Sequence, residues 1–384
     1  MNSLQLPIGE ISEQTKHLRT QIRDFLQYEK EHGTFVPKCD TWLSGFSADF
    51  SRKLGERGWI GMTWPLKYGG HERSAIERYV VIEELLAAGA PVAGHWIADR
   101  QTGPLLLRYG TEEQCKEFLP RIARGECYFA IGLSEPNAGS DLAAVHTRAE
   151  KVDGGWILNG SKTWTSGAHH AHYMITLCRT SPYHPEKRHE GMSQLLVDLT
   201  SPGVTIRPIL LMTGEHHFNE VFFEDVFIPE NRLIGVEGNG WKQGMTELAY
   251  ERSGPERFLS TYPLLEELIN QLRKTGDKHL MVQGSKLVSR LCTLRQMSIG
   301  IAYLLEKGES PDIAAALVKD MGTRFEQQVA EIARLLIPTA PSTNAANRLD
   351  QLMAQAVLHA PGFTLRGGTT EILRGIVAKG VIAK

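Results

Sequence analysis

Hydrophobic positions along the chain have a helical spacing at both ends and a two-residue alternation in the middle. Up to about residue 125, apolar residues three and four apart predict helices, and two segments have the composition of capping boxes. These are Ser74-Ala-Ile-Glu77, before Arg78–Ala88, and Thr111-Glu-Glu-Gln114, before Cys115–Arg124. The pattern predicts an N-terminal α-helical domain over residues 1–125.

Residues 126–232 alternate apolar and other side chains, as strands with one buried face do. The alternating positions are Trp156/Leu158, Tyr173/Ile175/Leu177, Leu195/Val197/Leu199, Val204/Ile206 and Val221/Phe223. The turn signals between them are Asp153-Gly-Gly155, Asn159-Gly160 and Ser201-Pro-Gly203. The pattern predicts a middle antiparallel β domain.

Helical spacing returns over residues 233–384 and predicts a helical bundle. The expected helices begin at residue 240 and cover Leu264–Leu272, Ser285–Leu305, Pro311–Leu336 and a last segment after Gly368. Residues 338–348 are polar and predict a loop. The predicted fold class is therefore α+β, with the domain order α, β, α.

Composition excludes several classes of partner. A net charge of -2 gives no reason to expect nucleic acid or an anionic membrane surface. Five cysteines without a C-x-x-C pair indicate a reducing compartment rather than a disulfide framework. No secretion signal and no run of about 18 apolar residues is found, so we expect a cytoplasmic protein without a membrane span.

Two glycine- and histidine-rich segments carry weak functional signals. Gly235-Val-Glu-Gly-Asn-Gly240 lacks the G-x-G-x-x-G spacing and a β-α-β setting, so a loop is the better interpretation. His169-His170-Ala-His172 has no H-E-x-x-H pattern or acidic cluster near it, so we predict no metal site. No G-x-S-x-G hydrolase motif is present.

Two other segments suit a planar, anionic ligand. Small residues and Pro136 in Ile131–Asp141 leave backbone N–H groups uncovered, as anion-binding loops require, although a turn-rich start of a β domain has the same composition. In Asn159–Ala168, Trp164 is flanked by hydroxyl residues, which suits stacking on an aromatic ring and hydrogen bonding at its rim.

Four separated motifs resemble those of the acyl-CoA dehydrogenases and follow one another in the family's order along nearly the whole chain. They are Ser134-Glu-Pro-Asn-Ala-Gly-Ser-Asp141, Gly160-Ser-Lys-Thr-Trp-Thr-Ser166, Phe218-Asn-Glu-Val-Phe-Phe-Glu-Asp-Val-Phe-Ile-Pro229 and Gly367-Gly-Thr-Thr-Glu-Ile372. The resemblance implies a middle β-barrel domain (126–232) and a C-terminal four-helix-bundle domain (233–384). It also implies FAD-dependent oxidation of an acyl-CoA to a 2-enoyl-CoA, with electron-transfer flavoprotein as electron acceptor and a homotetramer or dimer as the assembly.

The resemblance also implies site residues. Those expected to bind FAD are Ile131, Leu133, Ser134, Gly139, Ser140, Trp164, Thr165, Ser166, Thr369 and Glu371. Trp164 would cover the isoalloxazine, Ser166 would hydrogen-bond near flavin N5, and Thr369 and Glu371 would meet the cofactor at the start of the last helix. Those expected to bind substrate are Ser140, Tyr250, Arg252 and Gly368.

The catalytic base is expected to be Glu251. Many family members carry a glutamate directly before the Gly-Thr segment, but Gly367 stands there, and only its N–H can take part, by donating to the thioester oxygen. Branches that handle branched or longer acyl groups place the glutamate one residue before an arginine on the first long helix of the third domain, as in Glu251-Arg252. Glu247 and Glu256 are the alternatives, and on local sequence alone Ala249–Arg257 reads as a helix that stops at Gly-Pro.

Departures from the family pattern leave other functions open. Family members bind a neighbouring subunit's FAD with an Arg-rich segment and a Gln-x-x-Gly-Gly motif, where this chain has Gly276–Met281 and Gln355–Gly362. Arg366 or Arg324 would have to replace those contacts, or the chain is a non-catalytic or half-site subunit of a heteromer. A flavin monooxygenase is a third hypothesis. The missing side chain at Gly367 favours a branched, cyclic or otherwise bulky acyl group.

Overall fold

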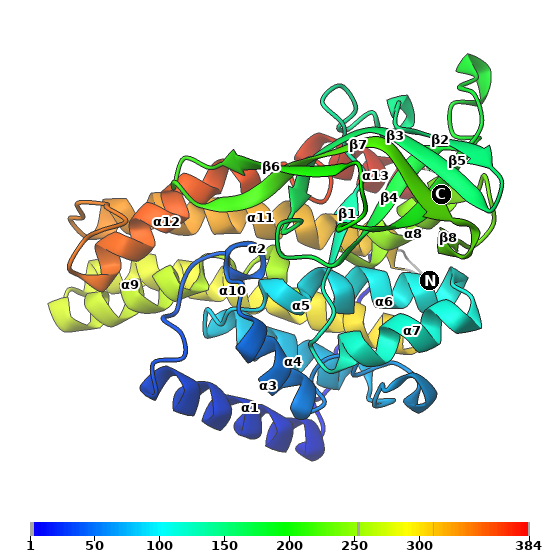
Figure 1. Cartoon of the computed structure of the whole chain (residues 1–384). Helices are drawn as coiled ribbons and strands as arrows, with labels where there is room; N and C mark the ends of the chain where they lie inside the picture. The colour runs from blue at the N-terminus through cyan, green and yellow to red at the C-terminus, as the bar shows by residue number, and fades with distance from the viewer. Residues whose placement is uncertain (1–3, 252–253, 310, 383–384) are drawn as a thin grey trace. The chain divides into compact units, whose positions relative to one another are not determined.

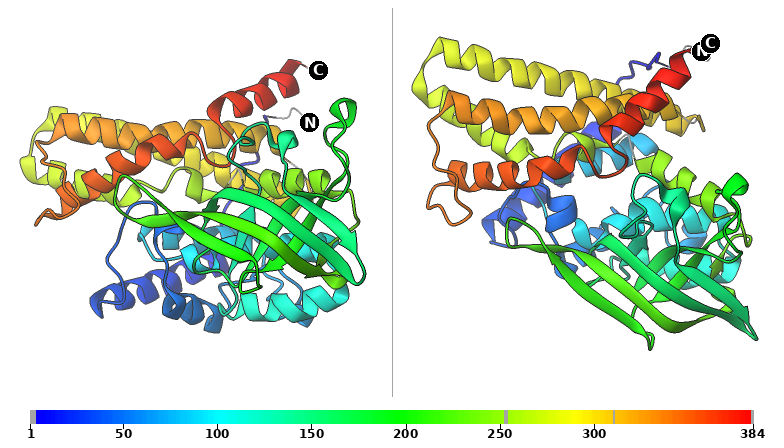
Figure 2. Two further views of the ribbon diagram at one scale, coloured as in Figure 1. Left: turned by 45° about the horizontal axis from the view of Figure 1, so that its top comes forward. Right: turned by 90° about the horizontal axis from the view of Figure 1, so that it is seen from above.

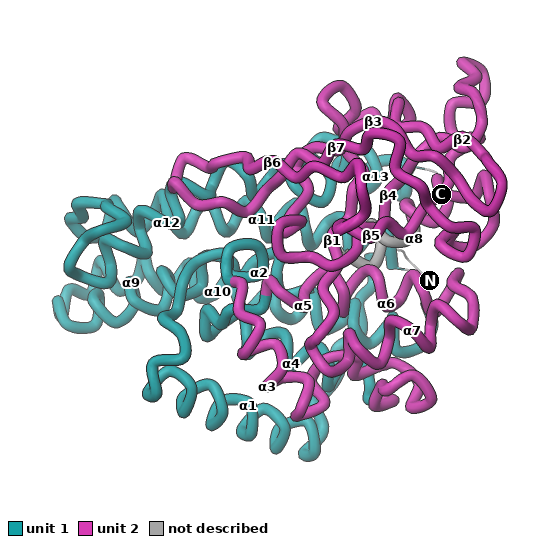
Figure 3. The backbone as a smooth tube through the Cα atoms, viewed as in Figure 1, with its two compact units in different colours: residues 1–45, 73–92, 252–384 teal, residues 46–72, 93–251 magenta. Residues whose placement is uncertain are grey.

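The computed structural model describes residues 4–251, 254–309 and 311–382, and only the backbone of residues 246–251. The chain forms two compact units (Figure 3). Unit 1 consists of Met1–Gly45, Arg73–Val92 and Arg252–Lys384, and unit 2 of Phe46–Glu72 and Ala93–Glu251. The chain-order domain boundaries at 125 and 232 are a different division and stay a prediction.

Unit 2 is built on one eight-stranded sheet (Figure 1). Its strands are β1 (Phe129–Gly132), β2 (Arg148–Val152), β3 (Gly155–Ser166), β4 (Tyr173–Arg179), β5 (Met192–Asp198), β6 (Val204–Leu210), β7 (His216–Pro229) and β8 (Leu233–Ile234). The order is β6-β7-β3-β2-β4-β5-β8, and β1 pairs with β4. All pairs are antiparallel except β1–β4 and β2–β4.

The α+β fold class is confirmed, but two details of the β domain are corrected. Among the described residues no strand pair closes the sheet, so it is an open sheet rather than the expected barrel. Asn159-Gly160 is not a turn but lies inside β3, where the register against β7 shifts between Leu158 and Gly160. Gly160 has a φ of 139° there, and a bulge accepts this backbone conformation because glycine has no Cβ.

One face of the sheet forms the core of unit 2. Trp156, Leu158, Val221, Phe223 and Leu195 are all buried in one cluster, as the two-residue alternation predicts. Helices complete the unit: α3 (Ala48–Glu56), α5 (Ala93–Ile97), α6 (Gly103–Tyr109), α7 (Glu112–Ala123) and α8 (Gly240–Glu251). The predicted capping box before α7 is confirmed, because Thr111 and Gln114 bond each other's backbone N–H groups.

Unit 1 contains the helical bundle (Figure 2). Its helices are α1 (Glu13–Glu31), α2 (Thr41–Ser44), α4 (Ala75–Ala87), α9 (Tyr262–Thr275), α10 (Lys278–Glu306), α11 (Asp312–Leu336), α12 (Arg348–Phe363) and α13 (Thr370–Ile382). Helices α9 to α12 pack on one another as a four-helix bundle, α13 packs on α11, and α4 packs on α1 and α10. The hydrophobic spacing did not predict α12 as a helix.

Charged residues join the helices of unit 1. Glu83 of α4 is nearly buried and accepts hydrogen bonds from Arg19 of α1 at 2.8 Å and from Arg295 of α10 at 2.7 and 3.0 Å. The predicted capping box of Ser74 and Glu77 at the start of α4 is confirmed. Within the described part of the chain, no helix is long and apolar enough to cross a membrane.

Candidate functional site

The first predicted flavin-binding segment is a short hairpin after β1. Glu135 and Ala138 exchange two backbone hydrogen bonds of 3.0 Å, and Ala138 packs into a small core with Leu142 and Val145. The residues expected to face the cofactor are more accessible: Leu133 and Ser134 are half-buried, and Gly139 and Ser140 are exposed. A Cβ added to Gly139 would have no atom within 4 Å, so open space adjoins the loop.

A buried ion pair fastens this hairpin to β3. Lys162, with no exposed surface, places Nζ 2.7 Å from Glu135 Oε1 and 3.1 Å from the carbonyl oxygen of Leu133. Glu135 also accepts backbone N–H bonds from His146 at 2.6 Å and Thr147 at 2.9 Å. Both motifs of the predicted flavin site therefore share one electrostatic anchor.

Each charge of this pair offsets part of the cost of burying the other. Burial opposes ionisation of Glu135, but the Lys162 charge and the hydrogen bonds outweigh it and lower the pKa of the carboxyl. Burial lowers the pKa of Lys162, and the charge of Glu135 works against that shift. The local sequence does not indicate this pair, although Lys162 stands an even number of residues after the buried Trp156 and Leu158, where a lysine requires a counter-charge.

The second predicted segment is the end of β3, where a bulge exposes Trp164. The register against β7 shifts between Lys162 and Thr165, and Trp164 has a φ of 56°, in the left-handed region. A bulge re-aims a side chain that would otherwise follow the strand alternation. The Trp164 side chain is 57% exposed and its ring meets Phe218 edge-on, with 5.8 Å between centroids.

These residues fit the planar, anionic cofactor that the sequence implies. Thr165 is fully buried, and its hydroxyl has no hydrogen-bond partner in the described part of the chain. Such a group is costly unless a ligand or water satisfies it. An exposed indole, an unsatisfied hydroxyl and the half-buried Ser166 thus occupy consecutive positions. FAD offers a ring to stack on and polar atoms at its rim, so the residues present match it.

The third predicted segment lies in unit 1, just before α13. Gly367 and Gly368 have φ values of 64° and 94°, and the Gly368 carbonyl accepts a 2.6 Å hydrogen bond from buried Lys319. Thr369 accepts a weak bond of 3.4 Å from the N–H of Ile372, as an N-cap residue does. Glu371 is exposed on the first turn, where its own N–H and the Thr369 hydroxyl lower its pKa.

Arg257 occupies the space beside Gly367. A Cβ added to Gly367 would lie 3.0 Å from Nη2, 3.2 Å from Nη1 and 3.3 Å from Cζ of Arg257. The Arg257 side chain is fully buried, with its guanidinium 5.1 Å from the Trp42 ring and 3.9 Å from the Glu256 carboxylate. The position that carries a carboxylate in many relatives therefore adjoins a buried cation, and Glu256, one of the alternative bases, is buried next to that cation.

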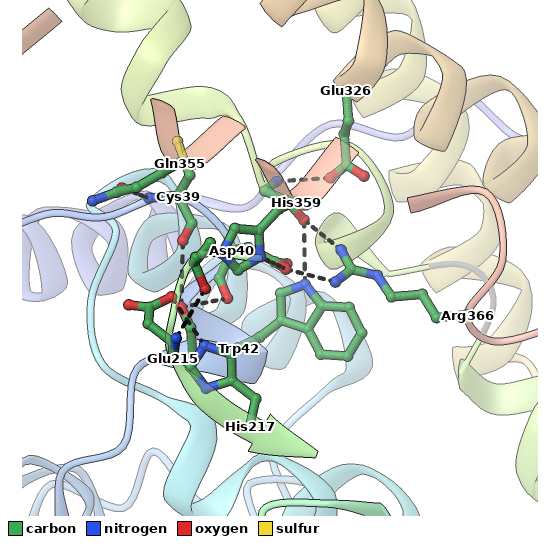
Figure 4. Close-up of polar contacts among 12 residues, drawn as sticks. Cys39, Asp40, Trp42, Glu215, His217, Glu326, Gln355, His359 and Arg366 are labelled. Atoms are coloured by element: carbon green, nitrogen blue, oxygen red, sulfur yellow. Dashed lines mark hydrogen bonds and ion pairs between the residues drawn. The ribbon is translucent and has the colours of Figure 1, made fainter. Parts of the chain in front are cut away.

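A polar cluster in unit 1 holds the segments considered for a neighbour's FAD (Figure 4). Asp40 accepts hydrogen bonds from His359 at 3.0 Å and Arg366 at 2.7 Å, and Arg366 also lies 3.1 Å from the Ser260 hydroxyl. Burial opposes ionisation of Asp40. The charge of Arg366 and the His359 hydrogen bond outweigh this effect and lower the pKa of the Asp40 carboxyl. Arg366 is therefore committed to a contact inside unit 1.

Side chains near this cluster are likewise hydrogen-bonded within unit 1. The Gln355 amide oxygen accepts a 3.0 Å bond from the Cys39 N–H, and Arg324 is bonded to Asp320 at 2.8 Å while remaining half exposed. Glu326 accepts a 2.8 Å bond from the Ser260 N–H, and burial raises the pKa of Glu326 to about 7. Sequence analysis assigned no role to Asp40, Glu326 or Arg257, because nothing in the local pattern indicates a buried charge there.

The predicted site residues thus fall into three groups. Unit 2 holds together Ile131, Leu133, Ser134, Gly139 and Ser140 with Trp164, Thr165 and Ser166. Unit 1 holds Gly367, Gly368, Thr369 and Glu371 in one turn. The backbone of Tyr250 and Glu251 ends α8, but their side chains, and all of Arg252, lie outside the described residues.

Replacing Lys162 with methionine tests the anchor. Lys162→Met leaves Glu135 buried without its charge partner, and we expect the free energy of unfolding to fall by about 3–5 kcal/mol. In Glu135→Gln/Lys162→Met no charge is buried, but the amide oxygen can accept only one of the two backbone N–H bonds, which end on different carboxylate oxygens, so we expect part of the loss to be recovered. The measurement is urea unfolding, with Arg148→Met, at an exposed ion pair with Glu150, as the control. A double variant no more stable than Lys162→Met would contradict the anchor role.

Comparisons with known proteins identify the family. Family models match residues 12–126 (acyl-CoA dehydrogenase, N-terminal domain), 130–226 (middle domain) and 267–382 (C-terminal domain). The chain is 34% identical over 343 residues to acyl-CoA dehydrogenase FadE29 of Mycobacterium tuberculosis, covering 85% of this chain and 86% of that protein. It is 35% identical over 334 residues to FadE34 of the same organism, but spans only 45% of FadE34.

A solved structure agrees over the whole chain. The structure of the Tcur3481-Tcur3483 steroid ACAD matches with a TM-score of 0.86 at 28% sequence identity, covering 98% of both chains. Three consecutive domain models, a relative above 30% identity that is matched over 86% of its length, and this fold point the same way. The chain belongs to the acyl-CoA dehydrogenase family, an enzyme family whose members are FAD-dependent flavoproteins.

Proposed function

We propose that the chain catalyses α,β-dehydrogenation of an acyl-CoA thioester and that Glu251 is the base. The Glu251 carboxylate takes the proton from Cα, and the C–H electron pair forms the Cα=Cβ bond. FAD, when bound, accepts the hydride that leaves Cβ. The remaining task of the protein is to hold the thioester so that charge developing on its oxygen meets hydrogen-bond donors.

One observation carries the choice of base: a buried guanidinium adjoins the position where many relatives carry a glutamate. Gly367 lies against Arg257, and its φ of 64° disfavours any side chain. A carboxylate placed there would pair with the cation and become a weaker base. Position 367 therefore favours a donor role for its N–H, and the base must come from elsewhere, for which Glu251 at the end of α8 is the proposed residue.

The proposed cofactor contacts follow from the site in unit 2. Trp164 would stack on the flavin ring, Thr165 and Ser166 would hydrogen-bond its rim, and the hairpin from Leu133 to Ser140 would line the flavin and its pyrophosphate. The exposed bulged indole and the unsatisfied Thr165 hydroxyl support these roles. Thr369 and Glu371, at the start of α13, are proposed to meet the same cofactor. Tyr250, Arg252 and Gly368 are proposed substrate contacts.

The acyl group and the electron acceptor are also proposals. The expectation of a bulky acyl group rested on the missing side chain at Gly367, but Arg257 fills that volume, so this reasoning no longer supports it. A bulky, steroid-like acyl group is proposed instead from the similarity to the steroid ACAD. Electron-transfer flavoprotein as acceptor and cytoplasmic location stay predictions of the family resemblance and the sequence.

A second candidate function is a half-site subunit of a heteromer. Family members use arginines to bind the FAD of a neighbouring subunit, and Arg366 is the candidate for that contact here. Its side chain is instead bonded to Asp40 and Ser260. Gln355 and His359, in the region of the family's Gln-x-x-Gly-Gly motif, are likewise bonded to Cys39 and Asp40. The name of the similar steroid ACAD joins two proteins, Tcur3481 and Tcur3483. These observations favour pairing with a second, different chain over a homotetramer.

Removing the Glu251 carboxylate tests the proposed base. Glu251→Gln is expected to retain FAD but to be reduced by acyl-CoA at least 100-fold more slowly, the usual contribution of a general base. The measurement is anaerobic bleaching of the flavin in a stopped-flow instrument. Glu247→Gln, one helical turn earlier, is the matched control and is expected to react at close to the wild-type rate. Normal reduction of Glu251→Gln would refute the assignment.

Adding a carboxylate at position 367 tests the role of Arg257. In the Glu251→Gln background, Gly367→Glu is expected not to restore flavin reduction, because the new carboxylate pairs with Arg257 and strains the backbone. Binding of acyl-CoA to the oxidised flavoprotein, followed by the flavin spectrum, separates loss of chemistry from loss of binding. Recovery of more than a tenth of the wild-type rate would show that position 367 can serve as the base.

Flavin content tests the heteromer. If the chain is half of a site, the purified protein alone is expected to hold less than one FAD per two chains, and to gain flavin and activity with a second acyl-CoA dehydrogenase chain. Flavin absorbance against protein concentration, with light scattering for the assembly, measures this. One FAD per chain in a homotetramer that is active alone would contradict the half-site function.

A further inference from the structure

His169 and His170, which follow β3, lie in an aromatic column within unit 2. Phe46, His170, His169 and His216 follow one another, with ring centroids 3.9, 3.9 and 3.7 Å apart. The Phe46–His170 and His169–His216 pairs are stacked at 11° and 18°. A metal requires ring nitrogens that converge on one point in the plane of each ring, and stacked faces do not offer this. The column therefore serves packing and hydrogen bonding.

Asn219 of β7 connects two rings of the column to the backbone of β3. Its side-chain Nδ2 donates to the carbonyl oxygen of Thr165 at 3.0 Å and lies 3.1 Å from Nδ1 of His169. Its Oδ1 lies 2.7 Å from Nε2 of His216. A carbonyl can only accept, so the amide orientation is fixed, and with it His169 Nδ1 accepts and His216 Nε2 donates.

The electrostatics of the column agree with that assignment. Asn219 has no exposed surface. Burial, followed by the nearness of His170 and His216, lowers the pKa of His169 to about 4. His169 is thus neutral near pH 7 and free to accept a hydrogen bond from the amide. The Asn219 amide is therefore bonded to β3 through one contact and to the column through two.

The connected backbone is the segment proposed to meet the flavin. Thr165 and Ser166 pair with Asn219 and Phe218 immediately after the bulge that exposes Trp164. The N–H of Gly167 donates to the carbonyl of His217 at 2.8 Å, so β7 holds both ends of Thr165–Gly167. A bulge loosens the ladder locally, and side-chain bonds can restore the register. The Asn219 amide provides such a bond at the first residue after the bulge.

We propose that Asn219, oriented by His169 and His216, is a positioning residue that fixes the Trp164–Ser166 backbone against the flavin. This inference rests on the proposed flavin contacts of that segment. Asn219 has no exposed surface, so its proposed action is indirect, through the Thr165 carbonyl. The histidine motif, which no step of the proposed reaction uses, thereby gains a role in cofactor binding.

The test removes the donor without changing the shape. Asn219→Asp cannot donate to the Thr165 carbonyl, and His216→Phe keeps the stacked ring but no longer bonds the amide oxygen. The control is His170→Phe, which keeps the column and has no side-chain bond to Asn219 among the described contacts. Hydrogen exchange of peptides covering residues 163–170 measures the segment, and FAD titration of the apoprotein measures binding. Where flavin binding needs a second chain, the titration uses the heteromer.

Asn219→Asp is expected to speed exchange over 163–170 about tenfold and to raise the Kd for FAD about tenfold, with a shifted visible spectrum of the bound flavin. His216→Phe is expected to change both in the same direction by less, and His170→Phe to match the wild type. If Asn219→Asp does not fold, His216→Phe carries the test alone.

Unchanged exchange in Asn219→Asp and His216→Phe would overturn the inference. So would faster exchange with unaltered FAD affinity and spectrum, which is what a merely structural role gives. Failure of the proposed function is seen separately in the wild type: a protein that binds FAD but is not reduced by any acyl-CoA refutes the dehydrogenase while leaving the positioning role standing. A wild type that takes up no FAD, alone or in a heteromer, overturns both.

Discussion

The buried ion pair between Glu135 and Lys162 is the constraint on which the flavin-side architecture depends. The hairpin after β1 has little apolar surface of its own, and the small residues that leave its N–H groups uncovered also leave it without much packing. A buried 2.7 Å ion pair fixes the hairpin to β3 instead. Because either charge alone would be costly to bury, the two motifs can only be kept or lost together.

Strand β3, which carries Lys162, also carries the proposed flavin contacts a few residues further on. The alternation of buried and exposed side chains along β3 is interrupted at the bulge. There Trp164 is exposed, and Thr165 remains buried with an unsatisfied hydroxyl. Asn219 holds the backbone again directly after this irregularity. One strand thus passes from a fixed anchor, through a bulge that exposes a stacking surface, to a second fixed point. These two fixed points hold the polar groups of Thr165 and Ser166 in place, while the core-facing side chains of β3 stay buried.

In unit 1 the buried guanidinium of Arg257 lies beside position 367, where many family members carry the catalytic glutamate. Arg257 lies in tight contact with the place where a side chain at 367 would begin, and its guanidinium has Trp42 and Glu256 as neighbours. Asp40 holds Arg366 and His359 in the same unit. Buried charges in this region are therefore paired with one another within the chain. This favours a redistributed active site, with the base on α8 and cofactor contacts shared with another chain.

Much of the fold follows from the sequence because periodicity and capping are local. The capping boxes at Ser74 and Thr111 and the strands around Trp156 and Tyr173 were predictable, since each depends on residues close together in the chain. The open sheet, the bulge at Asn159-Gly160 and helix α12 were not, because pairing and short apolar faces are decided by tertiary contacts. The partners of Lys162, Asn219 and Gly367 lie 27, 54 and 110 residues away in the chain, so their roles required three-dimensional contacts.

The central claim is that Glu251, and not a residue at position 367, supplies the catalytic base. A crystal structure with FAD and an unreactive acyl-CoA analogue bound tests this claim most directly. We expect the Glu251 carboxylate within about 3–3.5 Å of the substrate Cα, with the Gly367 N–H directed at the thioester oxygen. Another acidic group over Cα, or a Glu251 carboxylate directed away from the substrate, would contradict this assignment.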